Sequence, residues 1–391
     1  MLPYTLTAES EHCLQRIQNL RDRLDRAGPL PRSWLGRTRQ DLEVEAVAAS
    51  TRMEGVAVTV EEARRILAGD RPSGVDSGDA ALVDGYREAM RYVLARADDP
   101  HFEWHTELIL AIHHRVLAGS PAAGAGRLRD RQNWVSNSAT GAQVYLPPAA
   151  EQVPDLVRVF VSRLSDFPGP APVAAAWAHA CLAAVHPFAD GNGRTARVLA
   201  SLVMYRAGYQ APQFTSLEEW WGRHLSAYYA AFACLGSAWR PDTDVGPFVQ
   251  AHVCAQASQM AALDLRHQID KGVWTVLVDI AVHDLGLNER TANALYDAFF
   301  NRIITNRYYR GLTGITGVTA SHDLAKLVTA GLLRPDGAGR SAHYLGTDRL
   351  MHAVAAAAGL DLRAITPGTE LSNQRDSVLT ALAQRLHRRP Q

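Results

Sequence analysis

The segment His186–Arg197, with the sequence HPFADGNGRTAR, combines residue types that an ordinary turn does not need together. Gly191, Asn192 and Gly193 lead into a helical pattern that is expected to begin near Arg194. Backbone N–H groups at the start of a helix meet the positive end of its dipole, and glycine lets an oxygen approach them closely. The segment therefore predicts an anion site that suits phosphate.

Four side chains around this loop predict what happens to the bound anion. Arg194 and Arg197 are three residues apart, so they share a helix face and can hold two phosphates of one polyphosphate. Asp190 stands at the mouth of the loop, where a carboxylate beside phosphates suits Mg²⁺. His186 precedes the loop, and a neutral imidazole can take a proton from a hydroxyl. Together these residues predict a nucleotide-dependent transfer reaction.

The elements that must position these groups are mostly helices. Apolar residues at spacings of three and four predict a helix over residues 11–27, and similar patterns cover 173–185 and 195–209. The motif therefore lies at a helix–loop–helix junction. One hairpin is expected over 133–148, where two short β-prone pieces flank a turn rich in Ser, Asn, Thr and Gly. The tail after residue 366 is polar with a basic end, and we expect it to be ordered only in part.

Composition narrows the class of protein. The chain has 391 residues, 47% of them hydrophobic, which is enough for a globular protein of two or three domains. Lys plus Arg and Asp plus Glu each total 40, so a nucleic-acid surface would have to be local. No apolar run is long enough for a membrane span. The four cysteines (Cys13, Cys181, Cys234 and Cys254) are far apart in sequence, and we interpret them as buried reduced thiols of a cytoplasmic protein.

The motif resembles the H-P-F-x-D-G-N-G-R-x-x-R signature of the Fic (Fic/Doc, or fido) family and matches it at every specified position. The wider similarity runs from about Arg127, through the expected hairpin, to about Gly208. The chain departs from the family at Leu182-Ala183, where many members have Phe-Glu, and at Ala196, where glycine is commoner.

The resemblance implies a mainly α fold, with a Fic-type helical domain that transfers AMP from ATP to a Ser, Thr or Tyr hydroxyl of a target protein. By analogy, His186 deprotonates the hydroxyl and Asp190 binds Mg²⁺. Gly191, Asn192 and Gly193 cradle phosphates, while Arg194 and Arg197 hold the β- and γ-phosphates. The sequence does not identify the target, and the chain itself is one candidate.

Two further segments gain a role from the resemblance. The hairpin is similar to the family's flap, which pairs with the target's main chain; Val135, Gly141, Val144 and Tyr145 are its expected target-positioning residues. The stretch STRMEG (Ser50 to Gly55) resembles an inhibitory motif of the form [S/T]-x-x-x-E-[G/N]. If Glu54 pairs with Arg197, the γ-phosphate loses its anchor and meets a like charge. The same glutamate is an alternative candidate for positioning a water that removes AMP.

Residues 274–349 look like a winged helix-turn-helix. Residues 301–349 hold seven Lys or Arg against three Asp or Glu, an excess of four positive charges in a neutral chain. The candidates for DNA contact are Ser321, His322, Lys326 and Arg340. Docking or dimerisation is the alternative role, and a homodimer is left open.

We therefore expect four parts: an N-terminal helical region with the inhibitory helix (1–85), a Fic catalytic domain (86–270), a winged helix (271–350) and a tail (351–391). The main hypothesis is an autoinhibited protein adenylyltransferase. One alternative is a winged-helix transcription regulator whose Fic domain senses nucleotides. Another is a Fic enzyme with a different donor, such as UTP or a phosphocholine nucleotide, because phosphate anchors do not read the base.

Overall fold

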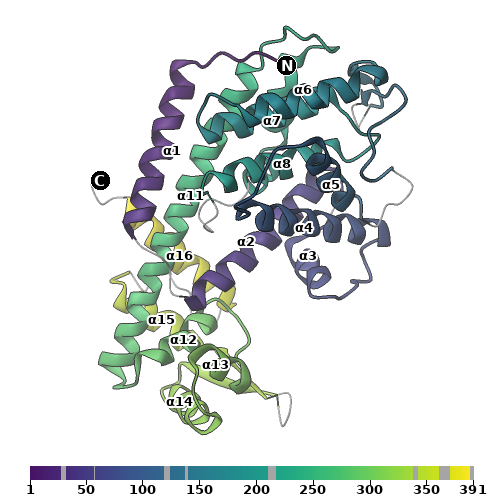
Figure 1. The fold of residues 1–391 in the computed structure, drawn as a ribbon. Coiled ribbons are helices and arrows are strands. Elements are labelled where there is room, and N and C mark those ends of the chain that lie inside the picture. The colour runs from purple at the N-terminus through teal and green to yellow at the C-terminus, as the bar shows by residue number, and fades with distance from the viewer. Residues whose placement is uncertain are drawn as a thin grey trace. The chain divides into compact units, whose positions relative to one another are not determined.

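The structure, a computed structural model, describes residues 1–27, 32–56, 58–118, 124–136, 140–209, 217–337, 342–360 and 370–387. The described residues are mainly helical, with two antiparallel sheets of two strands each, as Figure 1 shows. The expected mainly α fold is confirmed. The chain divides into two compact units, Met1–Leu263 and Asp264–Gln391. The finer division into four parts stays a prediction.

The first unit holds the motif, the hairpin and most of the helices. Its elements are α1 (Ala8–Ala27), α2 (Arg32–Met53), α3 (Val60–Leu67), α4 (Ser77–Ala97), α5 (Thr106–Val116), β1 (Val135–Ser136), β2 (Gln143–Tyr145), a 3₁₀ turn (Ala150–Gln152), α6 (Val153–Ser165), α7 (Ala171–Val185), α8 (Asn192–Arg206), α9 (Glu218–Arg223), α10 (Leu225–Ala231) and a second 3₁₀ turn (Phe232–Leu235). Helix α11 (Gly246–Asp279) begins in this unit and ends in the second.

The helix α8, which starts at the motif, lies in the middle of the first unit. It packs against α4, α5 and α7, and Figure 1 shows α7 and α8 side by side. Nearly all side chains of α7 are buried, because its sequence is alanine-rich and apolar on every face. Along α1, Ile17, Leu20 and Leu24 form the buried face that their spacing predicts. The loop between α7 and α8 is therefore held by two helices that cannot shift without disturbing the core.

The second unit contains the helix pair and hairpin expected for a winged helix. Its elements are a π-helical turn (Ile280–Asp284), a 3₁₀ turn (Glu289–Thr291), α12 (Ala292–Phe299), α13 (Asn306–Thr313), α14 (Gly317–Thr329), β3 (Leu333–Asp336), β4 (His343–Gly346), α15 (Asp348–Ala357) and α16 (Leu371–His387). Strands β3 and β4 pair antiparallel, with Leu333 opposite Gly346. The winged-helix assignment itself stays a prediction.

Part of the C-terminal tail forms a packed helix. Helix α16 packs against α15, and its Val378 and Leu382 side chains are buried. Gln374 of the same helix donates a hydrogen bond to Asp348 at 2.9 Å. Two apolar residues at a spacing of four thus form a packed face on the part of the tail that the structure describes.

Two of the four cysteines form a disulfide rather than remaining reduced. Cys13 of α1 and Cys254 of α11 are bonded across 241 residues of sequence, while Cys181 and Cys234 are free. The expectation of four reduced thiols was wrong for this pair, because sequence spacing carries no information about thiols that distant helices bring together. Among the described residues, no helix is both long and apolar enough to cross a membrane.

We expect the disulfide to stabilise the first unit, because closing so long a loop restricts the unfolded chain. Replacing Cys13 with Ser should lower the free energy of unfolding by about 2–4 kcal/mol, measured by denaturant unfolding without reductant. The Cys234→Ser variant is the matched control, since it removes a free thiol. Equal stability of wild type with and without dithiothreitol would contradict the expectation.

Candidate active site

His186 ends helix α7 in an unusual backbone conformation. Its φ is +49° and its ψ +58°, and its N–H donates to the carbonyl of Leu182 at 2.9 Å. Non-glycine residues adopt this left-handed region uncommonly, and such outliers persist where the surroundings hold them. The buried residue Arg129 stabilises this conformation. Its Nε donates to the His186 carbonyl, and its backbone N–H donates to the Pro187 carbonyl, both at 2.9 Å.

The imidazole of His186 is neutral at physiological pH. Burial lowers its pKa to about 4, and the nearby Arg129 guanidinium acts in the same direction. Its Nδ1 lies 3.3 Å from the Ala183 carbonyl. A carbonyl only accepts, so this contact requires the proton on Nδ1 and leaves the Nε2 lone pair available. That is the tautomer of a general base acting through Nε2.

The family departure at Leu182-Ala183 is compatible with this arrangement. His186 uses only the main-chain carbonyls of these two residues, and the Leu182 side chain is part of the core. A change of side chain there therefore leaves the backbone contacts of His186 in place.

The loop after His186 is fixed by its own asparagine. The Asn192 side chain accepts from the Phe188 N–H and donates to the Phe188 carbonyl, each at 2.9 Å. Asn133 also donates to that carbonyl, at 3.0 Å. Asn192 is buried, so its side chain shapes the loop, and its backbone N–H is the group that can face an anion.

His113 of α5 supports the same loop. Its ring stacks on Phe188 with 3.7 Å between ring centroids, so the phenyl ring anchors the loop as its apolar character suggested. Nδ1 of His113 accepts from the Gly126 N–H, so Nε2 carries the proton and donates to the Asp190 carbonyl, both at 3.0 Å. Burial lowers the pKa of His113 to about 4.

The roles of Arg129, Asn133 and His113 are not predicted from the sequence. Each acts on main-chain groups of the loop, and a contact to a carbonyl leaves no pattern in the sequence. A buried histidine inside an apolar helix looks like an ordinary core residue. Only the proximity of Arg129 and Asn133 to the expected hairpin gave a signal.

The start of α8 has the arrangement that the motif predicts for an anion site. Helix α8 begins at Asn192, two residues earlier than expected, after Gly191 in the left-handed conformation with a φ of +74°. The first amides of a helix have no intrahelical acceptors, and Gly191 has no side chain to cap them. The Arg194 and Arg197 side chains, 4% and 3% exposed, lie beside this helix start.

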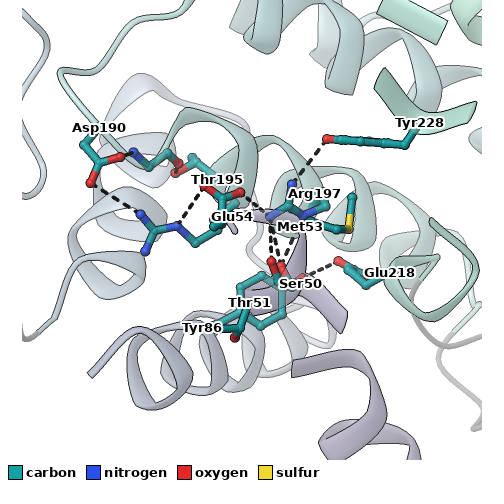
Figure 2. Close-up of polar contacts among 12 residues, drawn as sticks. Ser50, Thr51, Met53, Glu54, Tyr86, Asp190, Thr195, Arg197, Glu218 and Tyr228 are labelled. Carbon is teal, nitrogen blue, oxygen red and sulfur yellow. Dashed lines mark hydrogen bonds and ion pairs between the residues drawn. The ribbon is translucent and has the colours of Figure 1, made fainter. Parts of the chain in front are cut away.

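A carboxylate of the protein itself lies against this anion site. The Oε1 atom of Glu54 is 2.6 Å from Nη2 of Arg197, and Oε2 is 3.6 Å from Nε of Arg194. A Cβ atom placed on Gly193 would lie 3.1 Å from Oε1 of Glu54. Figure 2 shows Glu54 turned toward Arg197. The structure therefore brings the expected inhibitory glutamate to the expected phosphate-binding residues.

Arg197 is held on three sides. Ser50 Oγ accepts from Nε and Nη2 of Arg197 at 3.1 and 3.0 Å, and the Ser50 carbonyl accepts from Nη2 at 3.3 Å. Tyr228 of α10 accepts from Nη1 at 3.2 Å. Ser50 is fully buried, so this first residue of the STRMEG motif positions the arginine that Glu54 pairs with.

The glycine after Glu54 explains why the inhibitory motif ends helix α2 where it does. The Gly55 N–H donates to the Arg52 carbonyl, and the Val56 N–H donates to the Thr51 carbonyl. Gly55 has a φ of +85°. These are the two hydrogen bonds of a Schellman motif, which needs a left-handed residue just past the helix. Glu54 is therefore fixed at the end of α2.

Asp190 is the exposed member of the site. Its Oδ1 accepts from the Gly191 N–H at 2.6 Å, and Oδ2 lies 3.4 Å from Nη2 of Arg194. Its side chain is 58% exposed. Within the described ranges, no group of three or more His, Cys, Asp or Glu side chains is placed to hold a metal ion. A single accessible carboxylate suits only a cation that keeps most of its waters, as Mg²⁺ does.

The two strands of the expected hairpin pair with each other, close to the loop of the motif. Val135 pairs with Tyr145 and Ser136 with Gln143, with an irregularity between the two pairs. The buried Tyr145 donates to the Ala184 carbonyl at 2.9 Å. Val144 is 46% exposed, and Gly141 has a φ of +69°. Tyr145 therefore anchors the flap, whereas Val144 faces outward.

The candidates for DNA contact lie in the second unit. Ser321, His322 and Lys326 are exposed on α14. The Ser321 hydroxyl accepts from Asn306 at 2.8 Å, so it also joins α14 to α13. Arg340 lies outside the described residues.

Comparison with known proteins agrees with this site. Residues 103–204 match the sequence model of the Fic/DOC family. The chain therefore contains a Fic/DOC family domain, and it includes α5 to α7, the motif and most of α8.

Two curated relatives resemble about half of the chain or less. "Protein adenylyltransferase Fic" of Nematostella vectensis is 30% identical over 209 residues, covering 51% of this chain and 46% of that protein. "Protein adenylyltransferase fic-1" of Caenorhabditis elegans is 33% identical over 162 residues, covering 40% of this chain and 30% of that protein. The chain thus spans less than half the length of these relatives.

Solved structures show the same fold. A Fic family protein from Desulfovibrio desulfuricans G20 has a TM-score of 0.60 at 18% identity and covers 89% of this chain and 98% of its own. Residues 134–508 of C. elegans Fic-1 give a TM-score of 0.55 at 25% identity, covering 66% of this chain and 73% of theirs. The Fic-type fold expected from the motif is confirmed.

The neutral state of His186 can be tested without any assay of activity. Because burial lowers the pKa of its imidazole to about 4, His186 should stay neutral down to about pH 5, with the proton on Nδ1. Nitrogen-15 NMR of labelled histidines measures both the pKa of His186 and the nitrogen that carries its proton, and the His186→Gln variant assigns the signal. A midpoint near the ordinary value of about 6.5, or a proton on Nε2, would show that the imidazole is not held as described.

Proposed function

We propose that the protein is a Fic-type adenylyltransferase that transfers AMP from ATP to a Ser, Thr or Tyr hydroxyl of a target protein. The observation that carries the proposal is the anion site at the start of α8, with two buried arginines and a neutral imidazole one short loop away. The names of the two adenylyltransferase relatives support the choice of reaction. The motif alone would support transfer from a nucleotide without naming the group.

The proposed chemistry is one displacement at phosphorus. Nε2 of His186 takes the proton of the target hydroxyl as its oxygen bonds to the α-phosphorus of ATP. The bond from that phosphorus to the oxygen bridging to the β-phosphate breaks, and pyrophosphate leaves. Arg194, Arg197 and the first amides of α8 hold the β- and γ-phosphates and stabilise the charge that develops on the leaving group. His186 then releases its proton to water.

Asp190 is the residue proposed to hold Mg²⁺. Its accessible carboxylate at the edge of the anion site fits an ion that keeps several waters and also binds phosphate oxygens. When bound, the ion would supply charge neutralisation on the phosphates. The contact between Asp190 and Arg194 keeps the carboxylate turned toward the helix start.

The flap is proposed to position the target segment. Val144 is exposed on β2 while Tyr145 is anchored below it, so the hairpin offers an outer face without being free to drift. An extended target segment could add to this edge through main-chain hydrogen bonds, which hold a hydroxyl in place without reading much sequence. Val135 and Gly141 shape the same hairpin.

Glu54 is proposed to inhibit the enzyme by occupying the place of the terminal phosphates. Its carboxylate contacts Arg197 and Arg194 and lies against Gly193. ATP must displace it to reach the same donors, and a carboxylate left nearby repels the γ-phosphate. In the reverse reaction, the same carboxylate could position a water for removal of AMP from a modified target.

We keep two alternative functions for the protein as proposals: a nucleotide-sensing regulator that contacts DNA, and an enzyme that uses another nucleotide donor. A nucleotide sensor without turnover would not need a neutral base at His186, so the imidazole favours an enzyme over a sensor that regulates transcription. DNA contact by the second unit rests on the exposed Ser321, His322 and Lys326 of α14 and on the local excess of positive charge. A donor with another base, UTP or a phosphocholine nucleotide, would bind through the same phosphate contacts.

We expect Glu54→Gly to raise the rate of AMP transfer. A charge-assisted hydrogen bond contributes about 1.5–3 kcal/mol, so removing the competing carboxylate should increase transfer at low ATP by about tenfold to a hundredfold. The measurement is labelling of the chain itself and of lysate proteins with α-³²P-ATP. Parallel reactions with α-³²P-UTP test the choice of donor.

Two variants make this experiment decisive. Glu54→Gln keeps the shape of the side chain but removes its charge, so its rate should lie between wild type and Glu54→Gly. Adding His186→Ala to Glu54→Gly should abolish labelling, because the hydroxyl then has no base. Labelling that survives without His186 would contradict the proposed reaction, and a Glu54→Gly rate equal to wild type would contradict the inhibition.

A further inference from the structure

Helix α10, which follows the Fic/DOC family domain in the sequence, places two consecutive tyrosines on two different partners. Tyr228 accepts a hydrogen bond from Nη1 of Arg197 at 3.2 Å, as Figure 2 shows. Tyr229 donates one to the Met53 carbonyl at 2.6 Å. Met53 immediately precedes Glu54, and Glu54 forms an ion pair with Arg197. A single helical turn therefore contacts both sides of the inhibitory contact.

The hydroxyl of Tyr228 has only one orientation that satisfies its neighbours. Arg197 can only donate, so the Tyr228 oxygen must accept from it and send its own proton elsewhere. Nε2 of His179 lies 3.2 Å away and accepts that proton in the neutral tautomer that carries its own proton on Nδ1. Burial lowers the pKa of His179 well below its ordinary value, which keeps the ring neutral. Tyr228 is thus a fixed acceptor for Arg197, whichever anion Arg197 holds.

Tyr229 completes the end of the inhibitory helix. The last carbonyls of a helix have no intrahelical donors, and the Schellman motif at Gly55 uses those of Thr51 and Arg52. The carbonyl of Met53 receives the Tyr229 hydroxyl instead. This carbonyl belongs to the peptide that joins Met53 to Glu54. The hydrogen bond therefore fixes the orientation of the peptide plane before Glu54, and with it the direction of the Glu54 side chain.

Helices α9 and α10 pack closely against α2. Gly222 of α9 approaches α2 so closely that a Cβ atom there would lie 2.7 Å from the Cβ of Ala49. The Met53 side chain is buried with Trp221 and Tyr228 in one apolar cluster. Helices α9 and α10 and the end of α2 thus form one packed layer.

We propose that Tyr229 is a positioning residue that keeps Glu54 on Arg197, while Tyr228 positions Arg197 for either Glu54 or phosphate. The inference rests on the proposed function, because it assigns the control of that same site. The Tyr229 hydroxyl donates to the inhibitory segment, so it stabilises the inhibited state. The Tyr228 hydroxyl contacts the phosphate-binding arginine and His179, and not the backbone of the inhibitory segment, so it supports nucleotide binding. Removing the two adjacent hydroxyls should therefore have opposite effects.

The first experiment needs no nucleotide. Hydrogen exchange of the Glu54, Gly55 and Val56 amides is measured by NMR in the full chain, for wild type and Tyr229→Phe. Loss of one hydrogen bond should speed this exchange by about fivefold. Tyr308→Phe is the matched control, because it removes a tyrosine hydroxyl that binds Asp297 in the second unit, and it should leave these amides unchanged. Unchanged exchange in Tyr229→Phe would overturn the proposal.

The second experiment separates positioning from a general effect on the fold. In the wild-type background, Tyr229→Phe should lower the KM for ATP in self-labelling by about fivefold at nearly constant kcat, and in the Glu54→Gly background it should change nothing. Tyr228→Phe should raise the KM in both backgrounds. An equal effect of Tyr229→Phe with and without Glu54 would overturn the proposal. If Glu54→Gly shows no AMP transfer, the proposed function fails, and the exchange experiment still decides whether Tyr229 holds the segment.

Discussion

The structure depends on one electrostatic constraint: the buried guanidinium of Arg197 needs an anion. Its side chain is 3% exposed, and leaving a buried charge without its partner costs about 3–5 kcal/mol. Ser50 and Tyr228 supply neutral acceptors, and Glu54 supplies the charge. A phosphate of a bound nucleotide would satisfy the same need. In the function we propose, inhibition and substrate binding are therefore two solutions to one requirement, and they exclude each other because both use the same donors.

The core helices of the first unit hold the residues around Arg197 in place. Helix α8 carries the arginines through the core of the first unit, and α7 leads into His186 with almost no exposed side chain. The loop between them is held by Arg129, Asn133 and His113 through main-chain carbonyls. None of these contacts involves Glu54, so we expect the loop and His186 to keep their positions when Glu54 is displaced. In the function we propose, ATP binding displaces the short end of α2, which hydrogen bonds to one side chain of α10.

Much of this site could be predicted from the sequence because its chemistry uses side chains in a short, fixed pattern. His186, Asp190 and the two arginines lie within twelve residues, and Glu54 is marked by the glycine that ends its helix. The helices followed from apolar spacing. The supporting contacts could not be predicted in the same way, because Arg129, His113 and Tyr229 act on carbonyl groups that any residue carries. The Cys13–Cys254 disulfide and the packed face of α16 likewise depend on three-dimensional proximity that spacing does not report.

The claim that Glu54 occupies the place of the terminal phosphates is tested most directly by calorimetric titration of ATP and of AMP into wild type and Glu54→Gly. AMP has no β- or γ-phosphate, so it cannot compete with the carboxylate for Arg197. We predict that Glu54→Gly binds ATP at least about tenfold more tightly than wild type while its affinity for AMP hardly changes. Equal gains for both nucleotides, or no gain for ATP, would contradict it.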